Sequence, residues 1–170
     1  TNSDTTLYSG QTSTLTIVFS EAVASFASGD DVSCPSGSLA TMTSGDSITW
    51  TGTLTPTTNT EDNTNTCDVA TSYTDTAGNA GPAGSSANYA VETLAPSVTS
   101  ITMSDTTLIE GETATLTIVF SETVAAFASN DDVTCASGSL AVMAISSGST
   151  WTGTFTPTAE TSDTSNVCTV

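Results

Sequence analysis

One stretch of eight residues, Thr14–Glu21, recurs as Thr115–Glu122 with the same letters, TLTIVFSE. Within it Leu, Ile and Phe alternate with Thr or Val, and a side-chain period of two indicates a β-strand with one buried face. A shift of about 101 positions aligns residues 1–69 with 102–170 without a gap, and roughly two-thirds of the aligned residues are identical. A repeat that continues ungapped through its loops predicts two copies of one fold, each about the size of a β-sandwich domain.

The charge of the chain excludes several classes of function. The sequence has no Lys, Arg or His against 18 acidic residues. Binding to phosphate groups needs cationic side chains, so nucleic acid is excluded as a partner and an anionic membrane surface is disfavoured. Without His or Lys the usual proton shuttles are missing, and a Ser–His–Asp arrangement cannot be built. A carboxylate pair is the one catalytic arrangement left, and we expect a protein that is not an enzyme.

Four cysteines permit three disulfide connectivities. The repeat favours Cys34–Cys67 with Cys135–Cys168, because each copy then carries its own bridge across a separation of 33 positions. Disulfides indicate an oxidising compartment. Neither a signal peptide nor an apolar run long enough to span a bilayer is apparent. The sequence therefore predicts a segment of a secreted or cell-surface protein without membrane insertion.

Short alternating runs separated by turn residues predict an all-β fold. The clearest are Thr12–Ser20 and Ile48–Thr55, and in the latter Trp50 and Leu54 share one face with Gly52. About seven such strands per copy indicate an immunoglobulin-like (Ig-like) β-sandwich, with Trp50 in its core. Further strands are expected at Thr5–Gly10, Val32–Cys34, Leu39–Thr43, Cys67–Tyr73 and Ala87–Val91, and loops at Glu21–Asp31, Thr57–Asn65 and Asp75–Gly84.

The repeat predicts two domains end to end, residues 1–94 and 95–170, joined near ETLAP at Glu92–Pro96. The first is expected to lack its first few residues, and the second its last two strands. One interpretation is a window cut from a longer repetitive chain. The alternative is a subunit completed by strands from a neighbouring molecule.

Several motifs together resemble the bacterial Ig-like repeats of large secreted surface adhesins. They are SDTTL, GETATLTIVFSE, DDV, WTGTFTPT, TDTAGN and ETLAP, and they cover essentially the whole chain. The resemblance implies an extended array of β-sandwiches, exported to the cell surface and often stiffened by calcium where domains join. The cysteine pairs of this chain and its lack of Lys and Arg depart from the usual pattern of such repeats.

Acidic and amide side chains are expected to meet at one end of each sandwich. The loop after the second strand and the loop between the last two strands should lie at this end, where the preceding linker also arrives. Oxygen ligands converging from several loops suit Ca²⁺ better than Mg²⁺. The alternative is a solvated acidic surface in which Asp75 and Asn79 cap a turn. The predicted ligands are Glu21, Asp30, Asp31, Asp75, Asn79, Glu92, Glu122, Asp131 and Asp132.

The sequence predicts a mechanical function: a rigid, non-enzymatic stalk or fibre for cell-surface adhesion, whose partners are neighbouring Ig-like repeats. The competing hypothesis is a subunit of a self-assembling extracellular filament, completed by strand exchange between neighbours. A carbohydrate-binding module would need aromatic side chains exposed along one face, and only Tyr8 and Tyr89 are candidates.

Overall fold

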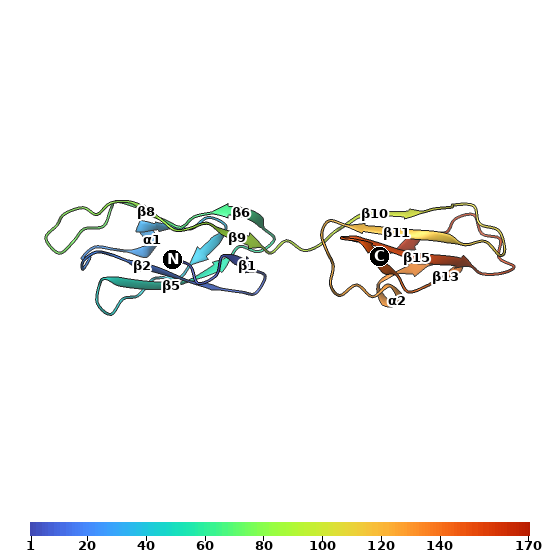
Figure 1. The fold of residues 1–170 in the computed structure, drawn as a ribbon, viewed down its shortest axis with the longest axis horizontal. Coiled ribbons are helices and arrows are strands. Elements are labelled where there is room, and N and C mark those ends of the chain that lie inside the picture. The colour runs from blue at the N-terminus through green and yellow to red at the C-terminus, as the bar shows by residue number, and fades with distance from the viewer. The chain divides into compact units, whose positions relative to one another are not determined.

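The computed structural model describes residues 1–170 and is almost entirely β (Figure 1). The chain forms two compact units, Thr1–Ala95 (unit 1) and Pro96–Val170 (unit 2). None of its helices has the length and the apolar character needed to cross a membrane. The prediction of an all-β fold is confirmed.

Unit 1 contains nine strands and one helical turn. Their bounds are β1 (Thr6–Tyr8), β2 (Ser13–Val18), α1 (Ser28–Asp31), β3 (Val32–Ser33), β4 (Gly37–Leu39), β5 (Thr49–Pro56), β6 (Glu61–Asn65), β7 (Asp68–Val69), β8 (Gly84–Ser85) and β9 (Tyr89–Glu92).

The strands of unit 1 form the two layers of a sandwich. One layer has the order β2–β5–β4, and the start of the chain joins β2 through a bridge between Asn2 and Leu15. The other is made of two short sheets, β1–β9–β6 and β3–β7–β8. These two sheets continue one another, because β7 follows β6 and β9 follows β8 along nearly the same lines. In this layer β1 and β9 run parallel, with Leu7 opposite Val91.

The core of unit 1 lies between these layers and follows the alternation of the sequence. Leu15 and Leu54 are buried, whereas the Thr residues beside Leu54 are exposed. The half-buried Trp50 packs against this core, with its ring centroid 4.9 Å from that of Phe26. The same pair recurs in unit 2, where the centroids of Phe127 and Trp151 are 5.0 Å apart. The prediction that these tryptophans belong to the cores is confirmed.

Unit 2 repeats the first layer and part of the second. Its main sheet has the order β10–β11–β15–β13, with β14 also pairing with β15, and β12 pairs with β16 in a second sheet. The bounds are β10 (Val98–Met103), β11 (Ala114–Phe120), α2 (Ser129–Asp132), β12 (Thr134–Cys135), β13 (Gly138–Leu140), β14 (Ala144–Ser147), β15 (Thr150–Pro157) and β16 (Cys168–Thr169).

Each unit has one disulfide, with the connectivity that the repeat predicts. Cys34 bonds to Cys67 and Cys135 to Cys168. The Cα atoms are 4.2 Å and 4.1 Å apart, which suits residues directly opposite each other on neighbouring antiparallel strands. In unit 2 the two cysteines are register partners of β12 and β16. The bridges therefore staple adjacent strands within one layer.

Four expectations for local structure were wrong. The strand expected at Leu39–Thr43 is instead β4 at Gly37–Leu39, followed only by an isolated bridge from Thr43 to Thr51. Thr57–Asn65 is not all loop, because β6 forms there by pairing with β9. The expected loop Glu21–Asp31 ends in the helical turn α1. The strand expected at Cys67–Tyr73 is only the two residues of β7, although Tyr73 is buried as its pattern predicts.

Candidate functional site

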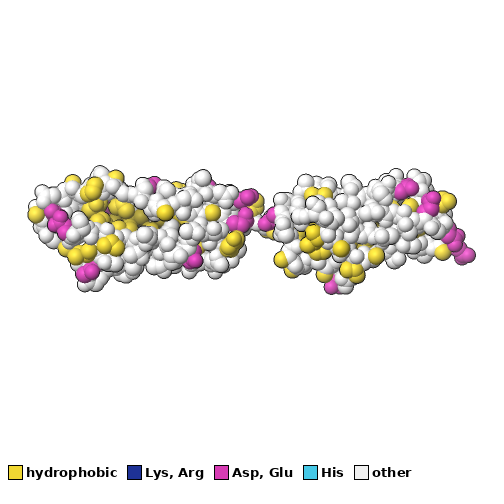
Figure 2. Space-filling view, viewed as in Figure 1, with side chains coloured by type: hydrophobic (Ala, Val, Ile, Leu, Met, Phe, Trp, Pro, Cys, Tyr) yellow, Lys and Arg dark blue, Asp and Glu magenta, His cyan; other side chains and the backbone are white.

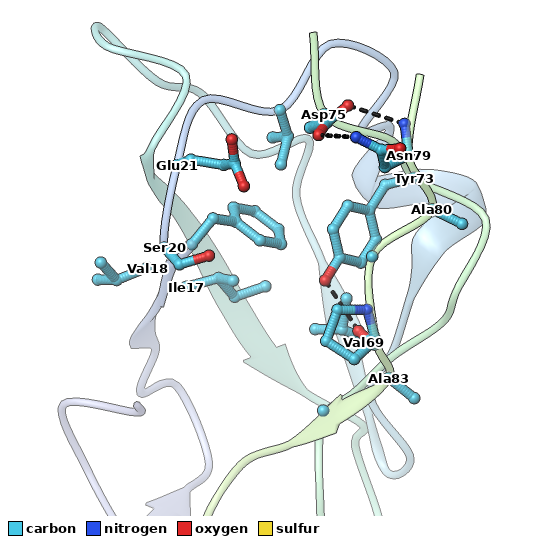
Figure 3. Close-up of a pocket in the computed structure, with 15 residues that line it drawn as sticks. Ile17, Val18, Ser20, Glu21, Val69, Tyr73, Asp75, Asn79, Ala80 and Ala83 are labelled. Atoms are coloured by element: carbon cyan, nitrogen blue, oxygen red, sulfur yellow. Dashed lines mark hydrogen bonds between the residues drawn. The ribbon is translucent and has the colours of Figure 1, made fainter. Parts of the chain in front are cut away.

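A groove of about 360 Å³ opens in unit 1 between β2 and the segment that contains β8 (Figure 3). Phe19 and Tyr73 line it, with their ring centroids 4.8 Å apart. The Tyr73 hydroxyl donates a hydrogen bond of 2.8 Å to the carbonyl of Pro82. The Tyr73 ring lies so close to Gly81 that a Cβ there would be 2.0 Å from it. Glycine is therefore required at this position.

In unit 1 the edge of β2 that does not pair with β5 is bonded to residues 1–3. The last backbone bond on this edge runs from Thr16 N–H to the carbonyl of Thr1, at 2.8 Å. In unit 2 the equivalent edge is covered by β10, with Val98 opposite Phe120.

The structure brings three of the predicted ligands, Glu21, Asp75 and Asn79, to the wall of this groove. Asp75 Oδ1 accepts hydrogen bonds of 2.8 Å from the backbone N–H groups of Ala77 and Asn79, and its Oδ2 accepts one of 2.7 Å from Asn79 Nδ2 (Figure 3). These bonds hold the pKa of Asp75 below its ordinary value of 3.8, and the bond from the Asn79 side chain contributes most. Asp75 thus fastens its own turn, and of the two carboxylates only Glu21 is exposed.

Asp30 and Asp31 do not line the groove. Asp31 is only 4% exposed. Its Oδ2 accepts a hydrogen bond of 2.7 Å from Ala27 N–H, and its Oδ1 accepts one from the Ser72 hydroxyl. Asp31 therefore ties α1 to the segment after β7, whereas Asp30 is exposed.

The remaining predicted ligands are placed as follows. Glu92 is half-buried in β9 and accepts a hydrogen bond of 3.2 Å from Leu94 N–H. Glu122 is half-buried just after β11, and Asp131 and Asp132 are exposed in α2. Asp132 Oδ2 accepts a hydrogen bond of 2.8 Å from Ala128 N–H. Within either unit, no three carboxylate or thiol side chains converge in an arrangement that could hold a metal ion.

Two carboxylates outside the predicted ligand set, to which the sequence analysis assigned no role, fasten the same turn in the two units. Asp62 Oδ2 accepts a hydrogen bond of 2.9 Å from the Ser36 hydroxyl, and Asp163 accepts one of 3.2 Å from Ser137. The backbone N–H of Thr64 is the main cause that lowers the pKa of Asp62, and the backbone N–H of Ser165 is the main cause that lowers that of Asp163. Both serines have φ 54°. The identical spacing of Ser and Asp in the two repeats was the available signal.

Acidic side chains gather toward the ends of each unit on the face that Figure 2 shows, and no basic side chain appears there. This matches a chain of net charge −18 without any Lys, Arg or His.

Comparison with known families adds one finding. A family model described as a bacterial Ig-like domain matches residues 1–91 and again residues 92–170. No curated protein and no solved structure gives a match. Because the two matches together span the whole chain, and because each unit has the layered sheets of such a domain, the chain belongs to the bacterial Ig-like domain family, with two domains in tandem.

Proposed function

We propose that this chain is a force-bearing segment of an extracellular array of Ig-like domains, a stalk or fibre that holds an adhesive tip away from a cell. It catalyses no reaction, and its partners are neighbouring repeats of the same kind. The observation that carries the proposal is the parallel pairing of β1 with β9 in unit 1, with Thr6, Leu7 and Tyr8 opposite Ala90, Val91 and Glu92.

Parallel pairing of the first and last strands matters for a domain that is pulled through its ends. Tension draws β1 backward along its own direction and β9 forward, so the two strands must slide past each other. The bonds between them, including Ala90 N–H to the carbonyl of Thr5 at 2.8 Å, are then loaded together. An antiparallel pair pulled from one end would open one bond at a time. A unit built in this way resists stretching.

The disulfide supports the same function by limiting extension once a unit does unfold. The 33 positions from Cys34 to Cys67 lie inside a covalent loop and transmit no extension. At about 3.3–3.6 Å per extended residue, the bridge withholds roughly 110 Å of length from each unfolded unit. A stalk with such bridges lengthens less and keeps its broken units compact enough to refold.

Calcium remains part of the proposal as a stiffening ligand, bound through the acidic residues after the second strand of each unit. In unit 1 both oxygens of Asp31 and Asp75 are engaged by the chain's own donors. A cation would therefore depend first on Glu21 and Asp30 there, and on Glu122 and Asp131 in unit 2. Affinity should be low, with Kd on the order of 10⁻⁴–10⁻³ M. A melting curve unchanged between calcium and chelator would contradict this part alone.

Single-molecule force spectroscopy tests the mechanical function. The chain is pulled through handles at its two ends, with and without a reductant, and the larger unit 1 is identified by its longer extension. We expect unit 1 to unfold at higher force than unit 2 of this 170-residue chain, in which residues 107–109 pair with no strand. Reduction should lengthen each extension by about 110 Å. Unit 1 unfolding at no greater force than unit 2 would contradict the proposal.

A further inference from the structure

The outward face of the paired strands β2 and β5 in unit 1 carries almost only threonine. The alternate residues of both strands pack in the core, and register partners project from the same side of a sheet. The outward residues therefore form one patch, the threonine face of unit 1. None of its members is buried. They pair as Thr14 with Thr53, Thr16 with Thr51, and Val18 with Thr49.

Unit 2 repeats this face residue for residue, across β11 and β15. In unit 2 β10 widens the face, because Thr102 lies opposite Thr117 and Ser100 opposite Val119. No acidic and no aromatic side chain belongs to the face in either unit. The members shared with unit 1 are Thr115, Thr117, Val119, Thr150, Thr152 and Thr154.

The carboxylates lie elsewhere on the surface. In unit 1 the strands of the opposite layer carry Glu61, Asp68 and Glu92, and acidic side chains gather toward the ends of each unit on the face in Figure 2. The chain has a net charge of −18 and no basic side chain, and a large net charge of one sign opposes self-association. Two copies can approach closely only through surfaces that bring no carboxylates together, and the threonine faces meet this condition.

The chemistry of the threonine face suits a partner of its own kind. A basic partner would find no carboxylate here to pair with, and a sugar would find no aromatic ring to stack on. Threonine offers a methyl group that can be buried and a hydroxyl group that both donates and accepts hydrogen bonds, so two threonine faces complement each other. The β-branched side chain is stiff at χ1, and it therefore loses less entropy on contact than Lys or Glu would.

We propose that the threonine faces are lateral docking surfaces, on which a second copy of this chain packs sheet against sheet. Three strands in unit 1 or four in unit 2, each about 20 Å long and about 4.8 Å from the next, offer roughly 300–400 Å² per unit. A stable interface needs about 600 Å² or more on each partner, so one pair of faces associates weakly and repeated faces along an array add up. This goes beyond load bearing, because it joins stalks side by side into a bundle.

Concentration-dependent NMR of the full 170-residue chain tests the proposal. We expect the methyl signals of Thr16, Thr51, Thr117 and Thr152 to shift as the concentration rises toward about 1 mM, with Kd on the order of 10⁻⁴–10⁻³ M. Added NaCl should strengthen the association at least about threefold, because it screens the repulsion between carboxylates. Methyl signals that do not move with concentration would overturn the proposal. Shifts that appear only when a neutral polysaccharide such as dextran is added would do the same and would assign the face to a sugar.

Charge variants on the face separate docking from folding. Thr51→Glu with Thr152→Glu should weaken self-association at least about tenfold, since carboxylates then meet across the contact. Thr76→Glu with Thr161→Glu adds the same charge at exposed positions off the face, and this matched control should associate like the unaltered chain. Mixing the face variant with Thr51→Lys, Thr152→Lys should tighten binding at least about tenfold, an effect that misfolding cannot produce. The proposal is overturned if the face variant associates as well as the control, or if the mixture binds no better than the face variant alone.

Discussion

Asn65 and Asn166 occupy equivalent places in the two repeats, yet the first is 2% exposed and the second is an exposed side chain. Leu7 and Leu108 differ in the same way, 0% exposed against half-buried. The residues are identical within each pair, so their own chemistry cannot explain the difference. What differs within residues 1–170 is β9, which lies beside these residues in unit 1 and whose counterpart in the second repeat would fall after Val170.

In unit 1, β1 and β6 are strands because β9 lies between them and pairs with both. Residues 107–109 read TLI where β1 reads TLY, and they form no strand. Strand propensity depends strongly on the neighbours that a side chain packs against. The counterpart of β2, β11, pairs with β10 from Leu116 to Phe120, whereas the matching edge of β2 is bonded to residues 1–3.

The largest effect should come from removing the anchor of β9. Tyr89→Ala leaves a cavity among Leu7, Leu54 and Val91, and we expect it to lower the free energy of unfolding of unit 1 by about 3–5 kcal/mol. Chemical denaturation of the whole chain should show the unit 1 transition moving while that of unit 2 stays. Tyr8→Ala is the matched control, because Tyr8 is 52% exposed, and it should change stability by less than about 0.5 kcal/mol. Comparable losses in the two variants would contradict the role of β9.

Reduction of the disulfides should have the next largest effect on stability. The two units should also differ in the rate at which their bridges are reduced. A bridge that closes a loop of this size stabilises by about 3–4 kcal/mol. Cys67 is buried at 3% exposure, whereas Cys168 is half-buried. A reductant reaches an accessible sulfur first, so unit 2 should be reduced before unit 1. Mass spectrometry of alkylated thiols measures the order, and simultaneous reduction would show that β9 does not shield the bridge.

Asp31 and Asp132 form a matched pair for a smaller effect. Asp31 accepts hydrogen bonds from Ala27 and Ser72, whereas Asp132 accepts one, from Ala128. Asp31→Ala removes a buried acceptor, leaves the donors of Ala27 and Ser72 unpaired and should destabilise unit 1 by about 1–3 kcal/mol. Asp132→Ala, at an exposed site, should cost unit 2 about 1 kcal/mol or less. Thermal melts of the two variants test this, and equal losses would contradict the importance of Ser72.

High pH should weaken unit 1 alone. Burial, together with the nearby carboxylates of Asp62 and Asp68, raises the pKa of Tyr89 from 10.0 to about 12. Because the folded unit favours the neutral phenol, its stability is complete below pH 10 and falls as pH rises from 10 toward 12. Unit 2 has no tyrosine. Ultraviolet absorbance of tyrosinate, measured together with unfolding as pH is raised, should show this loss of stability. The variant Tyr89→Phe should not show the loss.

The sequence predicted those parts of the fold that local patterns determine. Alternation located β2 and β5 and their buried faces, and the repeat paired the cysteines. It could not reveal β6, whose residues EDNTN are polar and do not alternate, because that strand depends on β9 more than 20 positions away. Nor could it show that Asp31 turns inward, since Ser72 is 41 positions distant. The meeting of Glu21 with Asp75 was predictable, because the layer order places both loops at one end.

Hydrogen exchange of matched amides measures the central claim most directly, since exchange reports which backbone groups are held in stable pairs. The account predicts slow exchange at Ala90 and Asn65 of unit 1 and at least about a hundredfold faster exchange at Asn166 of unit 2. Trp50 and Trp151, in strands that both units complete, should exchange alike. Equal protection of Asn65 and Asn166 would contradict the conclusion that β9 orders the strands that bear the load.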